Sequence, residues 1–357
     1  MIKYIGSKRR LVPVLGELLD RCRATTALDL FTGTTRVARE WKRRGAHVVA
    51  VDTARYSEAL SGCYVATDAA TVDVEGVTAA LRRLQDLDGR VGYFTETFSR
   101  RARYFQEHNA RRIDAIRDAI DGFGPDHPWR PVLLTSLLEA ADRVDSTTGV
   151  QMAYLKNWSP RSYLELELRL PDLLPGSGTS VRADATRVAS LLPAAGLAYL
   201  DPPYNQHRYA GNYHVWETLM AWDAPDHYGV ACKRSDLREG SGSSVFNRRR
   251  QAPEALARLI DEVPADTLLV SGSDEGWVTP GEVADMAASR GTVEVLAFDS
   301  KRYVGAQIGI HNPQGQKVGQ VGRTRNIEYL VVAGPADTVG RMCAGFTRWS
   351  PAASASA

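Results

Sequence analysis

The apolar positions of the first fifty residues change their spacing in a regular order. From Leu11 to Cys22 they recur at the helical period, and Pro13 suits the first turn of a helix. An apolar run at 27–31 predicts a buried strand, and the polar turn 32–35 separates it from a helix over 36–44. A second strand is predicted at 48–51, with Asp52 at its end. Strand, glycine turn, helix and strand in this order predict the start of a doubly wound α/β sheet.

This α/β pattern is interrupted in the middle of the chain. Between about 72 and 170 the apolar spacing is mostly helical, most clearly at 111–120 and 132–144, and the turn-rich stretch 173–180 predicts a linker. The α/β pattern then resumes, with helices predicted at 185–192 and 253–262 and strands at 180–184, 196–200, 267–271, 293–298 and 327–333. We therefore expect one open-sheet domain made of 1–71 and 180–349, a mainly helical insertion at 72–179, and a disordered tail at 350–357.

Composition excludes several classes of protein. The 44 Lys and Arg nearly balance the 42 Asp and Glu, and the 44% hydrophobic and 24% charged fractions are typical of a globular protein. A histone-like polycation is excluded, although a local basic face is not. No apolar run approaches the roughly 20 residues of a membrane span, and the first ten residues are too charged for a signal peptide. The four cysteines are far apart, so we expect no metal site and a reducing, cytoplasmic setting.

The segment Asp201-Pro202-Pro203-Tyr204 directly follows a predicted buried strand. In open α/β sheets this carboxyl edge is where ligands bind. The exocyclic amine of adenine is a poor nucleophile because its lone pair is delocalised into the ring. The Asp201 carboxylate and the Pro202 carbonyl can each accept one of its N–H bonds and draw the nitrogen toward tetrahedral geometry. Tyr204 can stack on the base, so this segment predicts methyl transfer to an amine from a sulfonium donor.

A second motif precedes it, Asp29-Leu-Phe-Thr-Gly-Thr-Thr35. Its single glycine follows the first strand and opens a helix, where backbone N–H groups can face a carboxylate. Asp52, at the end of the next strand, is placed to bind ribose hydroxyls. Because the further glycines of a dinucleotide fingerprint are missing, S-adenosylmethionine is favoured over NAD. The third motif, Lys3-Tyr4-Ile5-Gly6-Ser7-Lys8, lies ahead of the first strand.

Together, the three motifs resemble the α-group of N6-adenine DNA methyltransferases, the Dam-like class that includes the methyltransferases of type IIS restriction systems. The resemblance covers most of 1–335 and implies a Rossmann-like, S-adenosylmethionine-dependent methyltransferase fold with a mixed sheet, in which 72–179 is the target-recognition insertion. The one departure is Thr35, where the family usually has Gly.

The resemblance also implies roles for individual residues. Asp201, Pro202 and Tyr204 would be catalytic. The cofactor would be bound by residues of all three motifs and by one further acid, which a helix N-cap explains equally well: Tyr4, Lys8, Phe31, Gly33, Asp52 and Asp201, with Asp184 as the further acid.

Double-stranded DNA is the expected partner, and the adenine must be extruded because its N6 is paired inside the duplex. Asn205, Tyr209, Asn212, Tyr213 and His214 either close over the extruded base or form an ordinary surface loop. Basic residues suit the DNA backbone: Arg100, Arg101, Arg103, Arg111 and Arg112 in the insertion, and Lys301, Arg302, Lys317, Arg323 and Arg325 in a carboxylate-free stretch that we expect to be mobile.

The leading interpretation is a site-specific DNA adenine-N6 methyltransferase, a monomer or weak dimer, with a possible cognate restriction endonuclease. Two alternatives remain open at this point. One is an amine methyltransferase acting on RNA, cytosine N4 or a protein amide, because these enzymes can use the same kind of segment. The other is an inactive, methyltransferase-like DNA-binding protein, which Thr35 keeps open. An NAD oxidoreductase is the least favoured.

Overall fold

A computed structural model describes residues 2–6, 8–206, 208–301, 310–311, 317–319 and 325–349. Within it the chain forms two compact units. The first unit comprises Met1–Ser7, Thr32–Ala183 and Arg208–Ser243, and the second comprises Lys8–Phe31, Asp184–His207 and Ser244–Ala357. The predicted residues 302–309, 312–316 and 320–324 of the cationic stretch, and the predicted tail at 350–357, lie outside the described residues.

A seven-stranded sheet has the order β3-β2-β1-β4-β7-β11-β8. Its pairs β2/β3, β1/β4 and β4/β7 are parallel, and β11 is antiparallel to both β7 and β8. The mixed, doubly wound sheet predicted from the sequence is therefore confirmed. Its bounds are β1 Thr26–Asp29, β2 His47–Asp52, β3 Gly178–Arg182, β4 Ala195–Leu200, β7 Ala265–Ser273, β8 Thr292–Lys301 and β11 Arg325–Gly334. Residues 197–200 and 267–271 are buried, as expected for strands covered on both faces.

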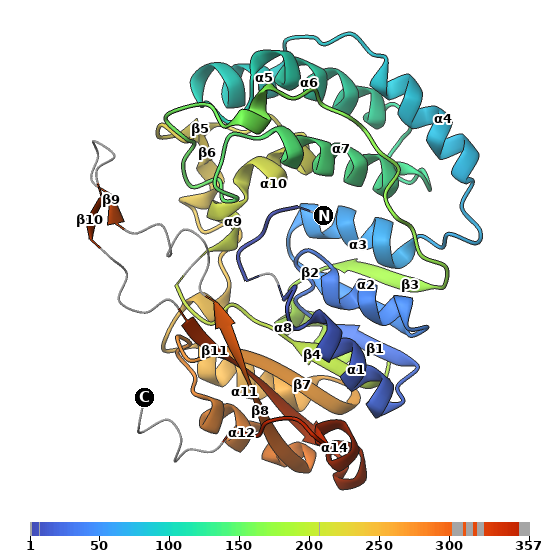
Figure 1. Cartoon of the computed structure of the whole chain (residues 1–357), viewed down its shortest axis with the longest axis vertical. Coiled ribbons are helices and arrows are strands. Elements are labelled where there is room, and N and C mark those ends of the chain that lie inside the picture. The colour runs from blue at the N-terminus through green and yellow to red at the C-terminus, as the bar shows by residue number, and fades with distance from the viewer. Residues whose placement is uncertain are drawn as a thin grey trace. The chain divides into compact units, whose positions relative to one another are not determined.

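In the second unit the helices flank the strands that carry the catalytic motif. The predicted helix at 185–192 is one turn of α-helix followed by a 3-10 turn at Ala189–Leu191. Helices α11 and α12 lie beside β7 and β8 in Figure 1. The helices of this unit are α1 Val12–Cys22, α8 Ala185–Val188, α11 Ala252–Glu262, α12 Pro280–Ala287 and α14 Ala336–Cys343, and a small pair of strands is formed by β9 Ile310–His311 and β10 Lys317–Gly319.

In the first unit, helices packed around one apolar core make up most of the structure between 72 and 179 (Figure 1). Phe94, Phe98 and Phe105 are fully or almost fully buried in it. The predicted helices 111–120 and 132–144 are confirmed within α6 and α7. The helices of this unit are α2 Arg36–Arg43, α3 Arg55–Ser61, α4 Val74–Gln85, α5 Tyr93–Thr95, α6 Glu107–Asp121, α7 Arg130–Val144, α9 Tyr209–Asn212 and α10 His214–Ala221, and a hairpin is formed by β5 His227–Tyr228 and β6 Lys233–Arg234.

The segment after the catalytic motif is helical. The alternative of an ordinary surface loop at 205–218 is wrong for 209–218, because α9 and α10 occupy it and Tyr213 and His214 are fully buried. Among the described residues, no helix is long and apolar enough to cross a membrane.

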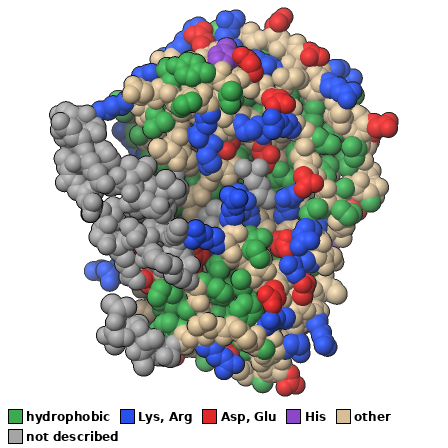
Figure 2. Space-filling model, in the orientation of Figure 1, with side chains coloured by type: hydrophobic (Ala, Val, Ile, Leu, Met, Phe, Trp, Pro, Cys, Tyr) green, Lys and Arg blue, Asp and Glu red, His purple; other side chains and the backbone are tan. Residues whose placement is uncertain are grey.

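The surface of the molecule mixes charges of both signs. On the face drawn in Figure 2, basic side chains recur across the middle and acidic ones lie among them. This agrees with the near-neutral total of the sequence, in which 44 basic residues face 42 acidic ones.

Candidate active site

Asp201 follows β4, and two other side chains of the second unit hold its carboxylate. Ser271 on β7 donates a hydrogen bond to Oδ1, with the two oxygens 2.5 Å apart. The Lys8 ammonium nitrogen lies 3.1 Å from the same oxygen. The Tyr199 hydroxyl lies 3.1 Å from Ser271 Oγ and fixes that side chain in turn. The carboxylate is therefore oriented before any ligand binds.

Lys8 is buried between two carboxylates. Besides Asp201, Glu328 on β11 lies 3.8 Å from its ammonium nitrogen, and the Tyr204 ring centroid lies 5.7 Å away. Burial alone would lower the pKa of Lys8, but the charge of Asp201 outweighs it, with smaller contributions from Tyr199, Tyr204 and Glu328, and holds that pKa well above its usual range. Lys8 is thus a permanent cation that stabilises the ionised form of Asp201.

The chain on the far side of the motif is anchored as well. The backbone carbonyl of Tyr204 accepts a hydrogen bond from Trp277 N at 3.1 Å, and that of Asn205 accepts one from Asn247 Nδ2 at 3.0 Å. Pro202 is buried, while the Tyr204 ring is partly exposed. Burial raises the pKa of Tyr204, so its ring is a neutral phenol at physiological pH. A fixed, neutral, partly exposed ring can stack on a base.

A second cluster, in the first unit, gathers around Asp52. Its carboxylate accepts hydrogen bonds from Gly33 N at 2.8 Å and Ala54 N at 3.0 Å. Burial raises the pKa of Asp52 although these N–H groups act in the opposite direction. Gly33 has φ +50°, and a Cβ there would lie 3.4 Å from the Tyr4 ring. The glycine turn and the acid that ends β2 are therefore bound directly to each other.

Tyr4 is the centre of an aromatic stack in the same unit. Its ring is nearly parallel to that of Tyr213, with centroids 4.5 Å apart, and to that of Tyr209, at 5.4 Å. The Tyr4 and Tyr56 hydroxyls lie 3.2 Å apart. Ile5 N donates to the Tyr213 hydroxyl at 2.6 Å. The arm that carries Tyr4 is therefore held by α3, α9 and α10.

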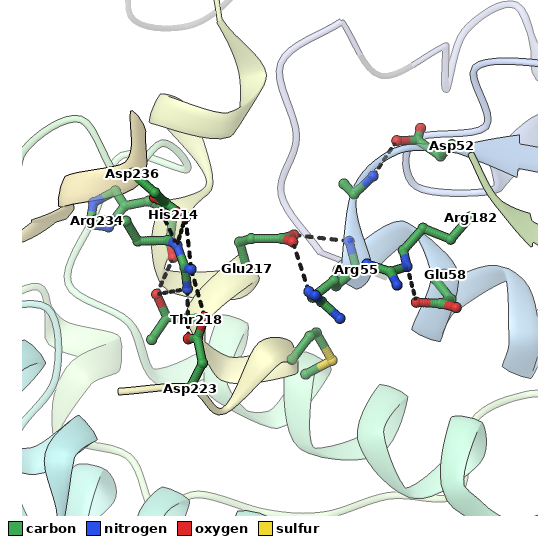
Figure 3. A network of polar contacts seen from close by, with 12 residues as sticks. Asp52, Arg55, Glu58, Arg182, His214, Glu217, Thr218, Asp223, Arg234 and Asp236 are labelled. Atoms are coloured by element: carbon green, nitrogen blue, oxygen red, sulfur yellow. Dashed lines mark hydrogen bonds and ion pairs between the residues drawn. The ribbon is translucent and has the colours of Figure 1, made fainter. Parts of the chain in front are cut away.

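Figure 3 shows a polar network that joins α10 to the chain after Asp52. Glu217 on α10 accepts a hydrogen bond from Arg55 N at 2.9 Å, and Arg55 Nε lies 3.6 Å from its other oxygen. Burial raises the pKa of Glu217 to about 7. Next to it, burial lowers the pKa of His214 to about 3, so this histidine is neutral and donates from Nε2 to the Gln151 carbonyl. These groups orient the helix that carries Tyr213.

Comparison with known proteins decides which family this is. The family model of D12 class N6 adenine-specific DNA methyltransferases matches residues 4–274. The chain belongs to this family. Its match spans both clusters and all three motifs.

Curated relatives agree with this assignment. Modification methylase StsI of Streptococcus sanguinis is 27% identical over 330 residues, which are 85% of this chain and 49% of that protein. Type II methyltransferase M.NlaIII of Neisseria lactamica is 27% identical, covering 85% and 92% of the two chains. The chain thus spans about half the length of StsI and most of M.NlaIII. A solved precorrin-8w decarboxylase from Methanobacterium thermoautotrophicum is 11% identical with a TM-score of 0.30, covering 90% of each chain, and carries no argument.

Thr35, the departure from the methyltransferase motif, has a backbone conformation that favours glycine. Its φ is +61°, it is fully buried at the N-terminus of α2, and its Oγ1 has no hydrogen-bond partner among the described residues. A β-branched residue in the left-handed region is strained. The structure thus accommodates Thr35 without changing the turn that binds Asp52.

Two further predicted cofactor residues have structural partners. Asp184 caps α8 by accepting hydrogen bonds from Thr186 N at 2.9 Å and Thr186 Oγ1 at 2.8 Å. The Phe31 ring packs edge-on against Phe246, with centroids 5.5 Å apart. Their contacts with a cofactor stay predictions, as do those of Tyr4, Lys8, Gly33 and Asp52.

Most of the predicted DNA-binding arginines of the insertion are engaged within the protein. Arg100 pairs with Glu96 and Glu107, and Arg103 donates to the Lys156 carbonyl at 2.7 Å. Arg111 and Arg112 bond backbone carbonyls of Gly89, Leu166 and Gln85, whereas Arg101 is exposed. Tyr209 is partly buried, and Asn212 and Tyr213 are buried. The side chains of Lys301, Lys317 and Arg325 are outside what the structure describes, and Arg302 and Arg323 lie outside the described residues altogether.

Sequence reasoning missed several residues of these clusters. Ser271 was noted only as part of Ser-Gly-Ser-Asp-Glu-Gly276, and its position near the end of β7 is the signal that could have paired it with Asp201. Glu328, Tyr56 and Glu217 carry no local signal, because only the fold brings them to their partners.

Proposed function

We propose that this protein is a site-specific DNA methyltransferase that transfers a methyl group from S-adenosylmethionine to N6 of an adenine extruded from duplex DNA. The observation that carries the proposal is Asp201, which stands at the end of β4 and is oriented by Lys8 and Ser271. Membership of the D12 class supports DNA adenine as substrate. The names of the relatives, a modification methylase and type II methyltransferases, support a role beside a restriction nuclease.

The residues present fit the proposed cofactor. Asp52 supplies a buried carboxylate at the end of a parallel strand, which suits ribose hydroxyls. The missing side chain of Gly33 and the ring of Tyr4 leave an aromatic wall beside that acid. The cofactor would supply an activated methyl group on a sulfonium. Among the described residues, no group of three or more His, Cys, Asp and Glu side chains is arranged to hold a metal.

The protein's own residues then act on the amine. Asp201 and the Pro202 carbonyl would each accept one N–H of the adenine amine, which localises the nitrogen lone pair for attack. Tyr204 would stack on the base and fix its plane. As the new N–C bond forms and the S–C bond breaks with its electrons on sulfur, the nitrogen loses one proton through the Asp201 side. Lys8 keeps Asp201 ionised while it accepts.

The test is sequencing of N6-methyladenine in a host that lacks this modification and expresses the protein. We expect adenine within one short DNA motif to be methylated, and none with Asp201→Ala. Label from S-adenosylmethionine that enters only RNA or protein would contradict the proposal. Isothermal titration separates the inactive alternative, because a pocket that the strain at Thr35 has disabled would show no heat of cofactor binding.

A further inference from the structure

Two large apolar side chains stand exposed at the tips of two loops in the first unit. Met152 is 52% exposed and Val230 is 80% exposed. Each adjoins a buried residue, Gln151 in the first loop and Ala231 in the second. An apolar side chain that a buried neighbour holds out in water is a candidate contact for another molecule.

The two tips are neighbours, although 77 residues separate them along the chain (230 minus 152 is 78, with 77 between). The buried Tyr104 hydroxyl lies 2.8 Å from the Gln151 carbonyl and 3.2 Å from the Ala231 carbonyl. Because one hydroxyl reaches both carbonyls, the loops run side by side, as the green segment and the β5–β6 hairpin do in Figure 1. Met152 and Val230 each lie one residue away from this junction.

The Met152 loop is fixed from both sides. Gln151 N donates to the Asn212 carbonyl at 2.7 Å, and Gln151 Oε1 accepts from Val215 N at 2.9 Å at the start of α10. On the preceding side, Thr147 Oγ1 donates to the buried Asp145, which Arg161 also binds. These bonds tie the loop to the helices that follow the catalytic motif.

The Val230 hairpin is fixed at its base. Arg234 on β6 makes two parallel hydrogen bonds to Asp223, at 2.8 and 2.7 Å, and a third to Asp236 at 2.9 Å (Figure 3). The turn from Gly229 to Cys232 closes with a hydrogen bond of 3.0 Å. Both tips are therefore preorganised, and binding a partner would order little additional chain.

Basic side chains surround these tips. Lys156 is exposed on the Met152 loop, and Arg103 donates to its carbonyl while lying 4.8 Å from the Trp158 ring centroid. On the hairpin, Arg238 is exposed and lies 3.9 Å from the Tyr228 ring centroid. Cations that flank rigid apolar tips suit duplex DNA, whose phosphates attract the cations while apolar wedges enter between base steps.

We propose that Met152 and Val230 together form an apolar wedge that enters duplex DNA beside the target adenine and holds open the space the base leaves. This inference rests on the proposed function and deepens it. The wedge takes over stacking that the duplex loses when the adenine leaves. Its contribution is therefore largest when the adenine is well paired and smallest when pairing is already broken.

The test compares methyl transfer to two duplexes that carry the motif found by sequencing. In one the target adenine is paired with thymine, and in the other it faces an abasic site. We expect the double variant Met152→Ser/Val230→Ser to lose about tenfold or more in kcat/KM on the paired duplex and much less on the abasic one. With 2-aminopurine at the target position, the fluorescence rise on binding should be smaller for this variant.

Two controls make the result decisive. Met152→Leu/Val230→Ile keeps an apolar tip and should retain activity, and Leu191→Ser removes an 80% exposed apolar side chain of the second unit and should have no effect. Equal losses on both duplexes, or no loss at all, would overturn the wedge while leaving the methyltransferase proposal intact. Wild-type protein that methylates neither duplex would defeat the proposed function, and the wedge with it.

Discussion

The Lys8 ammonium lies 3.1 Å from the Asp201 carboxylate, and the side chains are only 7% and 16% exposed. A buried ion pair is stabilising only while both partners are present, because either one alone is a desolvated charge. Ser271 and Glu328 are the other polar groups at this pair. The pair therefore links the stability of the second unit to its proposed catalytic acid.

A double-mutant cycle tests this link. Asp201→Ala leaves the Lys8 charge buried, so we expect it to lower the free energy of unfolding more than the double variant Asp201→Ala/Lys8→Met does. The coupling energy should be about 1–3 kcal/mol, measured by chemical denaturation. The neighbouring Arg9 is exposed and is the matched control. A cycle with Arg9→Met that gives the same coupling would show that the effect does not come from the ion pair.

Methyl transfer should depend on Asp201 far more than DNA binding does. Asp201→Ala removes the acceptor for the amine, and we expect turnover to fall by at least about a thousandfold. Salt-dependent DNA binding should stay near the wild-type level, because phosphate contacts come from basic residues elsewhere. Radioactive methyl transfer and a fluorescence binding titration at several salt concentrations measure the two effects. Near-normal turnover would refute the role of Asp201.

Thr35→Gly should stabilise the protein. With φ at +61°, the Thr side chain is strained, and its removal should raise the free energy of unfolding by about 1 kcal/mol after the greater backbone freedom of Gly in the unfolded state is included. Thr34 is also buried, but its φ is not positive, so Thr34→Gly should lower stability by a similar amount. Thermal and urea denaturation give both values. If the two substitutions shift stability in the same direction, strain at Thr35 is not the cause.

Glu217 should make stability depend on pH. Its pKa is raised to about 7 by burial, against about 4.3 in an unfolded chain. Between these values the folded state holds more protons than the unfolded state, so this group lowers stability as pH rises through the window. Glu217→Gln removes the titration while keeping an oxygen for Arg55 N.

The measurement is urea denaturation from pH 5 to pH 8. We expect Glu217→Gln to match the wild type near pH 5 and to exceed it by roughly 1–3 kcal/mol at pH 8. Glu239→Gln, at an exposed loop position, should run parallel to the wild type. An advantage of Glu217→Gln that is equal at all pH values would assign the effect to packing rather than to titration.

The sequence located the helices and strands best where burial follows the local spacing of apolar residues. The apolar runs at 196–200 and 267–271 lie inside β4 and β7. The helix predicted from 111 begins at Glu107, because the buried Asn109 bonds the Leu164 carbonyl and Leu166 N. A polar residue buried through distant partners carries no periodic signal.

The sequence by itself determined the motif order, the class of sheet and the position of Asp201 at a strand end, because these depend on residue types at short spacing. Only the tertiary structure decided which side chains surround that acid. Ser271 reaches Asp201 because β7 pairs with β4, and Glu328 approaches Lys8 because β11 pairs with β7. Strand pairing sets these neighbours through backbone hydrogen bonds between distant segments, which leave no mark on the spacing of residues along the chain.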